Sequence, residues 1–185
     1  MHAEGQALVN LQSSDFELFG LAECFAQDRA AIDARWKALQ REAHPDRFAA
    51  QGGAAQRIAM QWSVRINEAY RRLKDPLQRA AYLCELRGAP IEAENNTAMP
   101  AQFLMEQMAW REALDEATTP DDLEVLDVQL NASRTQALDS IQRLIDAQGD
   151  YRAAAQQVRA LMFIERFGQD VDTRIDKLEI IQGRQ

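Results

Sequence analysis

The spacing of large apolar residues between positions 58 and 73 is the feature of this sequence that most limits its fold. The apolar side chains recur at intervals of four, four, four and three residues: Ile58, Trp62, Ile66, Tyr70 and Leu73. At about 100° of rotation per residue, such intervals place side chains on one face of an α-helix. The Asp75-Pro76 pair then stops the pattern, because proline disfavours the helical conformation of the residue before it. The segment therefore predicts one long amphipathic helix.

Similar signals precede this helix. Ser14 and Asp15 can cap a short apolar turn that Gly20 ends, and Asp28 can cap a longer helix that Pro45 ends. One face of that longer helix is apolar: Ile32, Trp36, Leu39 and Ala43. We expect a loop at AAQGGAAQ, residues 49–56, and a further helix through LQRAAYLCELRG.

Three more helical patterns follow residue 99. They begin at Pro100, at Pro120 and at about Asp150, and the last two end near Gly149 and Ile181. Three long helices with short connections favour an antiparallel bundle. The chain has only 8 Gly and 5 Pro and contains no convincing pair of strands, so we expect an all-α fold.

The distribution of charge indicates two modules. Residues 1–87 carry 12 Lys and Arg against 11 Asp and Glu, whereas residues 88–185 carry 9 against 18. The stretch RGAPIEAENNTAMP between them has the composition of a linker. We predict four parts: a frayed N-terminus over 1–13, a first domain over 14–87, a linker over 88–99 and a three-helix bundle over 100–185.

Composition also argues against several classes of protein. No apolar run approaches the roughly 18 residues of a membrane helix, and the N-terminus lacks the basic start of a signal peptide, so we expect a cytoplasmic protein and no membrane partner. The acidic half would repel phosphates, so we expect no nucleic-acid partner. Cys24 and Cys84 form no CxxC pair and are expected to be reduced.

Three polar or rigid residues stand together where the second helix ends: His44, Pro45 and Asp46. Their connection, residues 44–53, should project at one end of the pair formed by the second and third helices. Lys37 and Arg41 lie on the side of the second helix opposite its apolar face, and Arg47 adds a further positive charge. The sequence therefore predicts a basic surface that runs into His44.

Two other interpretations of His44 and Asp46 remain, one structural and one catalytic. In one, both residues only satisfy backbone groups at a helix stop. In the other they are catalytic, but no nucleophile, glycine-rich phosphate loop or metal-ligating partner is nearby in the sequence, and the only other histidine is His2. We therefore expect no catalytic residue, no metal site and no cofactor.

The first domain resembles the J-domain family. Three stretches match its landmarks in order: DFELFGL the opening helix, RWKALQREAHPDRF the second helix and HPD loop, and INEAYRRLKDPLQRAAYL the third helix and closing turn. The resemblance implies an antiparallel hairpin of the second and third helices. It also implies that His44, Pro45 and Asp46 engage a DnaK-type chaperone and trigger its ATP hydrolysis. Ala43 departs from the family, where many members have a tyrosine.

The helix from Pro100 has two apolar stripes. One stripe can face the bundle core: Phe103, Trp110, Leu114 and Ala117. The other side carries Leu104, Met105, Met108, Glu112 and Glu116. In the last helix, Phe163 falls off the core period of Val158, Leu161 and Ile164. A bundle core buries only one stripe, so the second is either an exposed partner site or packs against the linker or first domain.

The whole layout resembles the HscB-type co-chaperones of iron–sulfur cluster assembly, in their bacterial form without a cysteine-rich N-terminus. DPLQRAAYLCELRG, AQFLMEQMAWREALDE and VRALMFIERF carry the resemblance. It implies that the bundle binds an IscU-type scaffold through these matching positions: Leu104, Met105, Met108, Glu112, Glu116 and Phe163. Ala109 departs, where a relative can carry glutamate.

These observations together predict a non-enzymatic adaptor. One module would hold the scaffold while the other stimulates a DnaK-type ATPase of the HscA kind. Two rivals are a general J-domain protein whose bundle binds other clients or dimerises, and an enzyme that uses His44 with Asp46.

Overall fold

The computed structural model describes residues 10–92 and 99–182, and these residues form helices and connections without a strand. The all-α prediction is confirmed. The chain divides into two compact units between Tyr82 and Leu83, within helix α4 (Pro76–Leu86). Parts of the predicted frayed N-terminus and linker, residues 1–9 and 93–98, lie outside the described residues.

The first unit opens with two short-range caps that the sequence predicted. Ser14 caps α1 (Asp15–Phe19): its hydroxyl accepts the Glu17 N–H at 3.1 Å, and the Glu17 carboxylate accepts the Ser14 N–H at 2.8 Å. Gly20 ends α1 in the left-handed conformation at φ 63°. Asp28 caps α2 (Arg29–Glu42) by accepting the Ala30 N–H at 2.9 Å.

The connection after α2 is more helical than the sequence indicated. Pro45–Gln51 form the 3₁₀ helix η1, and α3 (Gly53–Lys74) begins within the segment predicted as a loop. Proline at the first helical position has a backbone angle suited to a helix start, so Pro45 both ends α2 and begins η1. Gly52, at φ 96°, provides the only non-helical break between η1 and α3.

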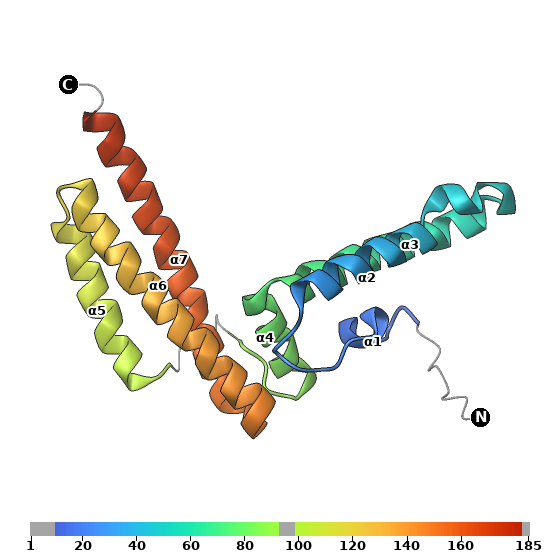
Figure 1. Cartoon of the computed structure of the whole chain (residues 1–185), viewed down its shortest axis with the longest axis horizontal. Coiled ribbons are helices and arrows are strands. Elements are labelled where there is room, and N and C mark those ends of the chain that lie inside the picture. The colour runs from blue at the N-terminus through green and yellow to red at the C-terminus, as the bar shows by residue number, and fades with distance from the viewer. Residues whose placement is uncertain (1–9, 93–98, 183–185) are drawn as a thin grey trace. The chain divides into compact units, whose positions relative to one another are not determined.

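Helices α2 and α3 lie side by side as an antiparallel hairpin (Figure 1). Ile66 and Leu73 are buried as predicted, together with Ala59 and Ala69, but Ile58 is exposed. The reason is geometric: an interval of four residues advances about 40° around a helix, so Ile58 lies about 80° from Ile66. The predicted apolar stripe therefore winds out of the core at its N-terminal end.

A buried carboxylate ties α1 to α3. The Asp15 side chain is fully buried, with Arg65 Nη1 2.6 Å from Oδ1 and Arg72 Nε 2.6 Å from Oδ2. The Asp15 N–H also donates to the Tyr82 hydroxyl at 3.0 Å. The same burial raises the pKa of Tyr82. The sequence suggested only a cap at this position, whereas the structure makes it the junction of three elements.

The second unit contains the three long helices of the predicted bundle, α5 (Ala101–Glu116), α6 (Pro120–Gln142) and α7 (Tyr151–Gln182), side by side in Figure 1. A π-helical segment, Arg143–Gln148, extends α6 to Gly149, which ends it at φ 65°. Thr119 caps α6 reciprocally with Asp122, and the Thr119 hydroxyl holds the pKa of Asp122 below its ordinary value.

The bundle core follows the predicted stripe of α5. Phe103, Trp110 and Ala117 are buried, and Leu114 is partly buried. The Phe103 ring lies edge-on to Trp110 at 5.7 Å, and Trp110 stacks on Phe167 of α7 at 6.1 Å. The bundle thus buries one face of α5 and leaves the other to solvent.

Candidate functional site

The tip of the α2–α3 hairpin presents His44, Pro45 and Asp46, which we name the HPD tip. The side chains of His44 and Asp46 are 58% and 90% exposed. His44 Nδ1 accepts the Asp46 backbone N–H at 3.3 Å, so the neutral ring carries its proton on Nε2, which is left to donate elsewhere. This arrangement caps η1 and orients the imidazole.

Hydrogen bonds from both sides hold the backbone around the HPD tip. The Ser63 hydroxyl of α3 donates to the Ala43 carbonyl at 3.2 Å, immediately before His44. On the other side, the Arg47 N–H donates to the His44 carbonyl at 3.0 Å. The Ser63 bond ties the tip to α3, and the Arg47 bond closes the first turn of η1.

Three exposed cations adjoin the tip: Lys37, Arg41 and Arg47, which we name the basic ridge. Arg47 turns back so that Nη1 donates to the Arg41 carbonyl at 3.1 Å, and Arg41 Nε donates to the Lys37 carbonyl at 3.3 Å. The structure thus brings the three predicted residues together on one exposed surface. Arg41 and Arg47 also place positive charge at the C-terminal end of α2, where the helix dipole favours it.

Contacts between the inner side of α2 and α3 hold α2 so that the basic ridge faces solvent. Trp36 stacks on Tyr70 of α3 with ring centroids 4.7 Å apart, and its indole N–H donates to Asn67 Oδ1 at 3.0 Å. Gln40 donates to the same amide oxygen at 2.7 Å. These contacts fix the rotation of α2, so Lys37 and Arg41 face solvent.

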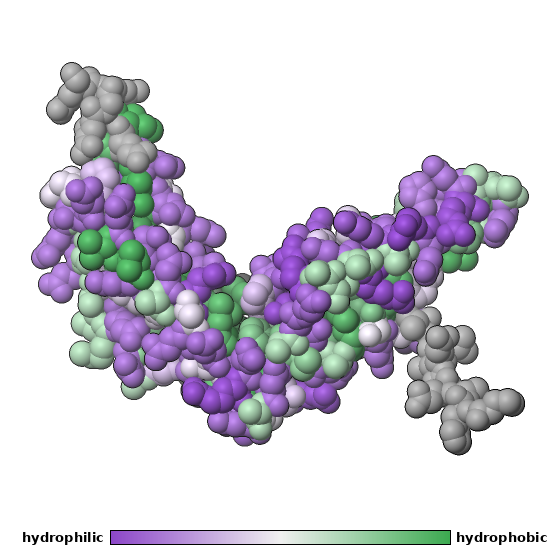
Figure 2. Space-filling model, viewed as in Figure 1, coloured by the Kyte–Doolittle hydropathy of each residue, from purple (hydrophilic) through white to green (hydrophobic). Residues whose placement is uncertain are grey.

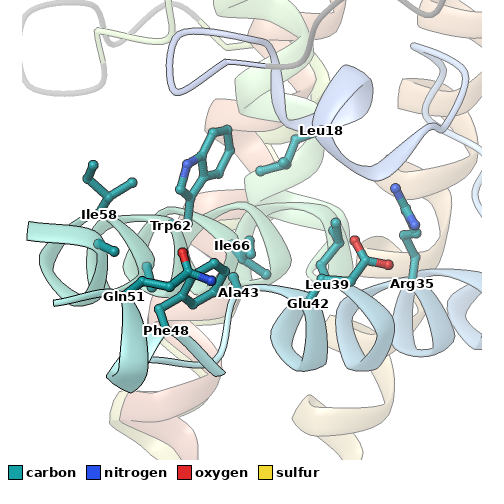
Figure 3. Close-up of a pocket in the computed structure, with 12 residues that line it drawn as sticks. Leu18, Arg35, Leu39, Glu42, Ala43, Phe48, Gln51, Ile58, Trp62 and Ile66 are labelled. Atoms are coloured by element: carbon teal, nitrogen blue, oxygen red, sulfur yellow. The ribbon is translucent and has the colours of Figure 1, made fainter. Parts of the chain in front are cut away.

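An apolar groove of about 470 Å³ lies beside the HPD tip, and sequence reasoning missed it. We name it the tip groove. Residues from α1, α2, η1 and α3 line it: Leu18, Arg35, Leu39, Glu42, Ala43, Phe48, Gln51, Ala55, Ile58, Ala59, Trp62 and Ile66 (Figure 3). The available signal was the drift of the four-residue spacing, which turns Ile58 out of the core.

In the second unit, Leu104, Met105 and Met108 are exposed on α5, with Met105 and Met108 at 70% and 69%. We name these three residues the α5 patch. Glu112 and Glu116 continue the same exposed side of the helix. The bundle therefore does not bury the second apolar stripe, and its residues form a surface with acidic neighbours.

Phe163 differs from the expectation that it lies clear of the core. Its ring is partly buried, edge-on to Phe103 at 5.8 Å and stacked on Phe167 at 5.8 Å. The Arg111 guanidinium lies over the same ring at 5.8 Å. A long aromatic side chain can reach the core from an off-period position, so Phe163 belongs to the edge of the core. Met162, which the sequence did not single out, is exposed beside it.

The described residues contain no group of three or more His, Cys, Asp and Glu side chains arranged to hold a metal ion. Within the same ranges, no helix combines the length and apolar character that crossing a membrane requires. The Cys24 thiol donates to the Ala26 carbonyl at 3.1 Å, and Cys84 is buried in α4.

Comparison with known proteins agrees with this geometry. A family model described as the HSCB C-terminal oligomerisation domain matches residues 99–172. The co-chaperone protein HscB homologs of Burkholderia multivorans and Burkholderia vietnamiensis are each 50% identical over 175 residues, covering 93% of this chain and 99% of the relative.

Solved structures give the same result. Chaperone HscB from Vibrio cholerae has a TM-score of 0.76 at 36% identity, covering 90% of this chain and 99% of that one. Human co-chaperone protein HscB has a TM-score of 0.83 at 25% identity, covering 90% and 84%. An exposed HPD tip on a helical hairpin, in one chain with a three-helix bundle, defines a J-domain co-chaperone. At this identity and coverage, the chain belongs to the HscB family of co-chaperones.

Proposed function

We propose that this chain stimulates the ATPase of a DnaK-type chaperone of the HscA kind and delivers an IscU-type scaffold to it during iron–sulfur cluster assembly. The HPD tip and the basic ridge bind the chaperone. The α5 patch, with Glu112, Glu116 and the edge of Phe163, binds the scaffold. The compartment we propose is the reducing cytoplasm, where cysteines stay reduced.

The observation that carries the proposal is the exposed, tightly held HPD tip. Ser63 of α3 holds the carbonyl before His44, and the Arg47 guanidinium ties η1 back to the Arg41 carbonyl of α2, so the exposed tripeptide is held from both helices. In the proposed mechanism the chain contributes no group to the chemistry of ATP. His44 Nε2–H and the Asp46 carboxylate offer one donor and one acceptor pair to the chaperone, and the basic ridge accelerates encounter with an acidic surface.

The α5 patch supplies the second half of the proposal. Exposed apolar residues gathered on one helix face usually mark a protein partner site. Glu112 and Glu116 favour a partner with basic residues around an apolar centre. Holding scaffold and chaperone on one chain raises the effective concentration of each for the other, so the chaperone meets the bound scaffold more often than a free one.

The first test is His44→Gln in a chaperone ATPase assay. We expect loss of stimulation with unchanged scaffold affinity, because the substitution touches only the tip. His2→Gln, at the chain's other histidine, is the control. Normal stimulation by a folded His44→Gln protein would refute the assignment of the tip.

The second test concerns charge. Reversing Lys37 and Arg41 to Glu should slow association with the chaperone, and the wild-type rate should fall with added salt, since exposed charges are screened beyond about 10 Å at 0.1 M. Reversing the exposed Arg143 and Arg152 of the bundle gives a control with the same change in net charge. Equal effects of the two double reversals would argue against a specific role for the ridge.

The third test separates the scaffold site from the chaperone site. Met105→Ala with Met108→Ala should weaken scaffold binding and leave basal ATPase stimulation intact. Val125→Ala with Val128→Ala, on an exposed side of α6, is the matched control. Unchanged scaffold affinity in the methionine variant would remove the α5 patch from the proposal.

The family model's description adds a second candidate partner for the bundle, another copy of the chain. Sedimentation of the same two double variants distinguishes the candidates. A wild-type oligomer that the methionine variant converts to monomer would assign the α5 patch to self-association.

A further inference from the structure

The tip groove and the basic ridge flank the HPD tip on opposite sides. On α2, the groove residues Arg35 and Leu39 each lie about 200° around the helix axis from the ridge residues two positions later, Lys37 and Arg41. At the hairpin end, apolar and polar surfaces adjoin (Figure 2). The tip therefore separates a charged surface from an apolar one.

The tip groove shares its elements with the HPD tip. Ala43 immediately precedes His44, and Phe48 lies two residues after Asp46 in the same 3₁₀ helix. Figure 3 shows Phe48, Gln51, Ile58 and Trp62 around one end of the groove. A partner that contacts the tip therefore meets the mouth of the groove without any movement of the hairpin.

The groove has the size and lining of a binding site. Its volume of about 470 Å³ lies within the range of about 300–1,000 Å³ typical of ligand sites. Ile58 is 55% exposed, and Phe48 and Trp62 are partly exposed, so three large apolar side chains remain open to water. Covering them would gain hydrophobic free energy that the hairpin alone does not.

We propose that the tip groove receives a large apolar side chain of the DnaK-type chaperone when the HPD tip docks; this inference rests on the proposed function. A standard interface buries about 800 Å² on each partner, which three tip residues cannot supply. The docking surface must therefore extend along the hairpin. The groove is the apolar surface continuous with the tip, and a buried apolar anchor is the contact that most affects the lifetime of a complex.

The two flanks then have different kinetic roles. The basic ridge acts over a distance, so it sets the association rate and its salt dependence. The groove acts only on contact, so it sets the dissociation rate and is insensitive to salt. This difference makes the groove testable independently of the ridge.

The test is Ile58→Asp, with Val64→Asp as its matched control. Both residues are on α3 with nearly equal exposure, 55% and 54%, but only Ile58 lines the groove. Binding of the full-length variants to the chaperone would be followed kinetically at low and high salt. We expect Ile58→Asp to raise the dissociation rate about tenfold or more at both salt concentrations, the loss expected for one buried aliphatic side chain. Val64→Asp should stay within about twofold of wild type, as for a surface substitution outside the contact.

Phe48→Ala provides a second variant that removes the groove wall without adding charge, and melting curves verify that each variant is folded. Equal dissociation rates for Ile58→Asp and Val64→Asp would overturn the groove proposal, whether both match wild type or both are raised. Failure of the proposed function appears separately, as normal ATPase stimulation by His44→Gln.

Discussion

Replacing Asp15 with Asn should be among the most damaging single changes in the first unit. The substitution keeps the shape of the side chain but removes its charge. Arg65 and Arg72, which both contact the carboxylate at 2.6 Å, would then face each other across a neutral amide. The Asp15 backbone N–H would keep its hydrogen bond to Tyr82, so the change isolates the charge.

The magnitude follows from the burial of the three partners. Removing one member of a buried ion pair typically costs about 3–5 kcal/mol, because the remaining charge stays desolvated. Arg72 is partly exposed and retains some hydration, whereas Arg65 is mostly buried, so we expect a cost of about 3 kcal/mol, the lower end of that range. With a urea dependence of about 1–3 kcal/mol per molar, the unfolding midpoint of the first unit should fall by about 1–3 M.

The indole N–H signals of the three tryptophans would report the two units separately during urea titration. Trp36 and Trp62 belong to the first unit and Trp110 to the second. We expect the first two signals to lose their folded position at lower urea in Asp15→Asn, while the Trp110 transition stays in place. Separate probes are needed because a chain of two units does not unfold as a single two-state system.

The control is Asp33→Asn, which removes a partly exposed charge from its surface pair with Arg29. The amide oxygen can still accept the Tyr70 hydroxyl, so the midpoint should stay nearly unchanged. The reasoning would be refuted if Asp15→Asn and Asp33→Asn gave the same midpoint. It would also be refuted if Asp15→Asn and Arg72→Ala added independently, since residues of one ion-pair network should be less than additive.

Three further changes test other parts of the structure. Phe163→Ala should lower the stability of the bundle by about 1–3 kcal/mol, because it removes ring contacts at the edge of the core; a thermal melt with no shift would show that the ring is dispensable. Gly149→Ala should cost about 1–2 kcal/mol, because Gly149 has a left-handed backbone at φ 65°. Gly168→Ala should stabilise by about 0.5–1 kcal/mol, because Gly168 lies inside α7 with open space at its Cβ position. Shifts of the melting temperature in the same direction for both variants would contradict this. Burial raises the pKa of the Cys84 thiol to about 11, so iodoacetamide at pH 8 should modify Cys24 far faster than Cys84. The thiol of the unfolded chain loses its proton at lower pH than the folded thiol. The free energy of unfolding should therefore fall as the pH rises from about 9.0 to about 11.

The ends of the helices were predictable because their signals are local. Ser14, Gly20 and Asp28 act on backbone groups within a few residues, and Pro120 and Gly149 do the same in the bundle. For the α5 patch the sequence left two alternatives, an exposed partner site or packing against the linker or first domain, because a bundle core buries only one stripe of a helix. The structure leaves the three residues exposed.

The remaining features depend on contacts between distant segments. Asp15 is buried by side chains about 50 and 57 positions away, which no local pattern encodes. Phe163 joins the core through Phe103, and that contact depends on how α5 and α7 cross. The tip groove needs four elements at once, so a stripe read along α3 alone placed Ile58 in the core.

The network beneath the HPD tip has a consequence for the entropy of partner binding. Asn67 accepts hydrogen bonds from both Trp36 and Gln40, and Ser63 holds the carbonyl before His44. These bonds join α2 and α3 into one rigid unit. A segment already fixed before association loses little conformational freedom when it docks, whereas ordering a free loop costs about 1–2 kcal/mol per residue. Most of the conformational entropy of this segment is thus already lost when the hairpin folds. Loosening Asn67 would weaken the complex even though Asn67 lies beneath the tip and outside the proposed contact.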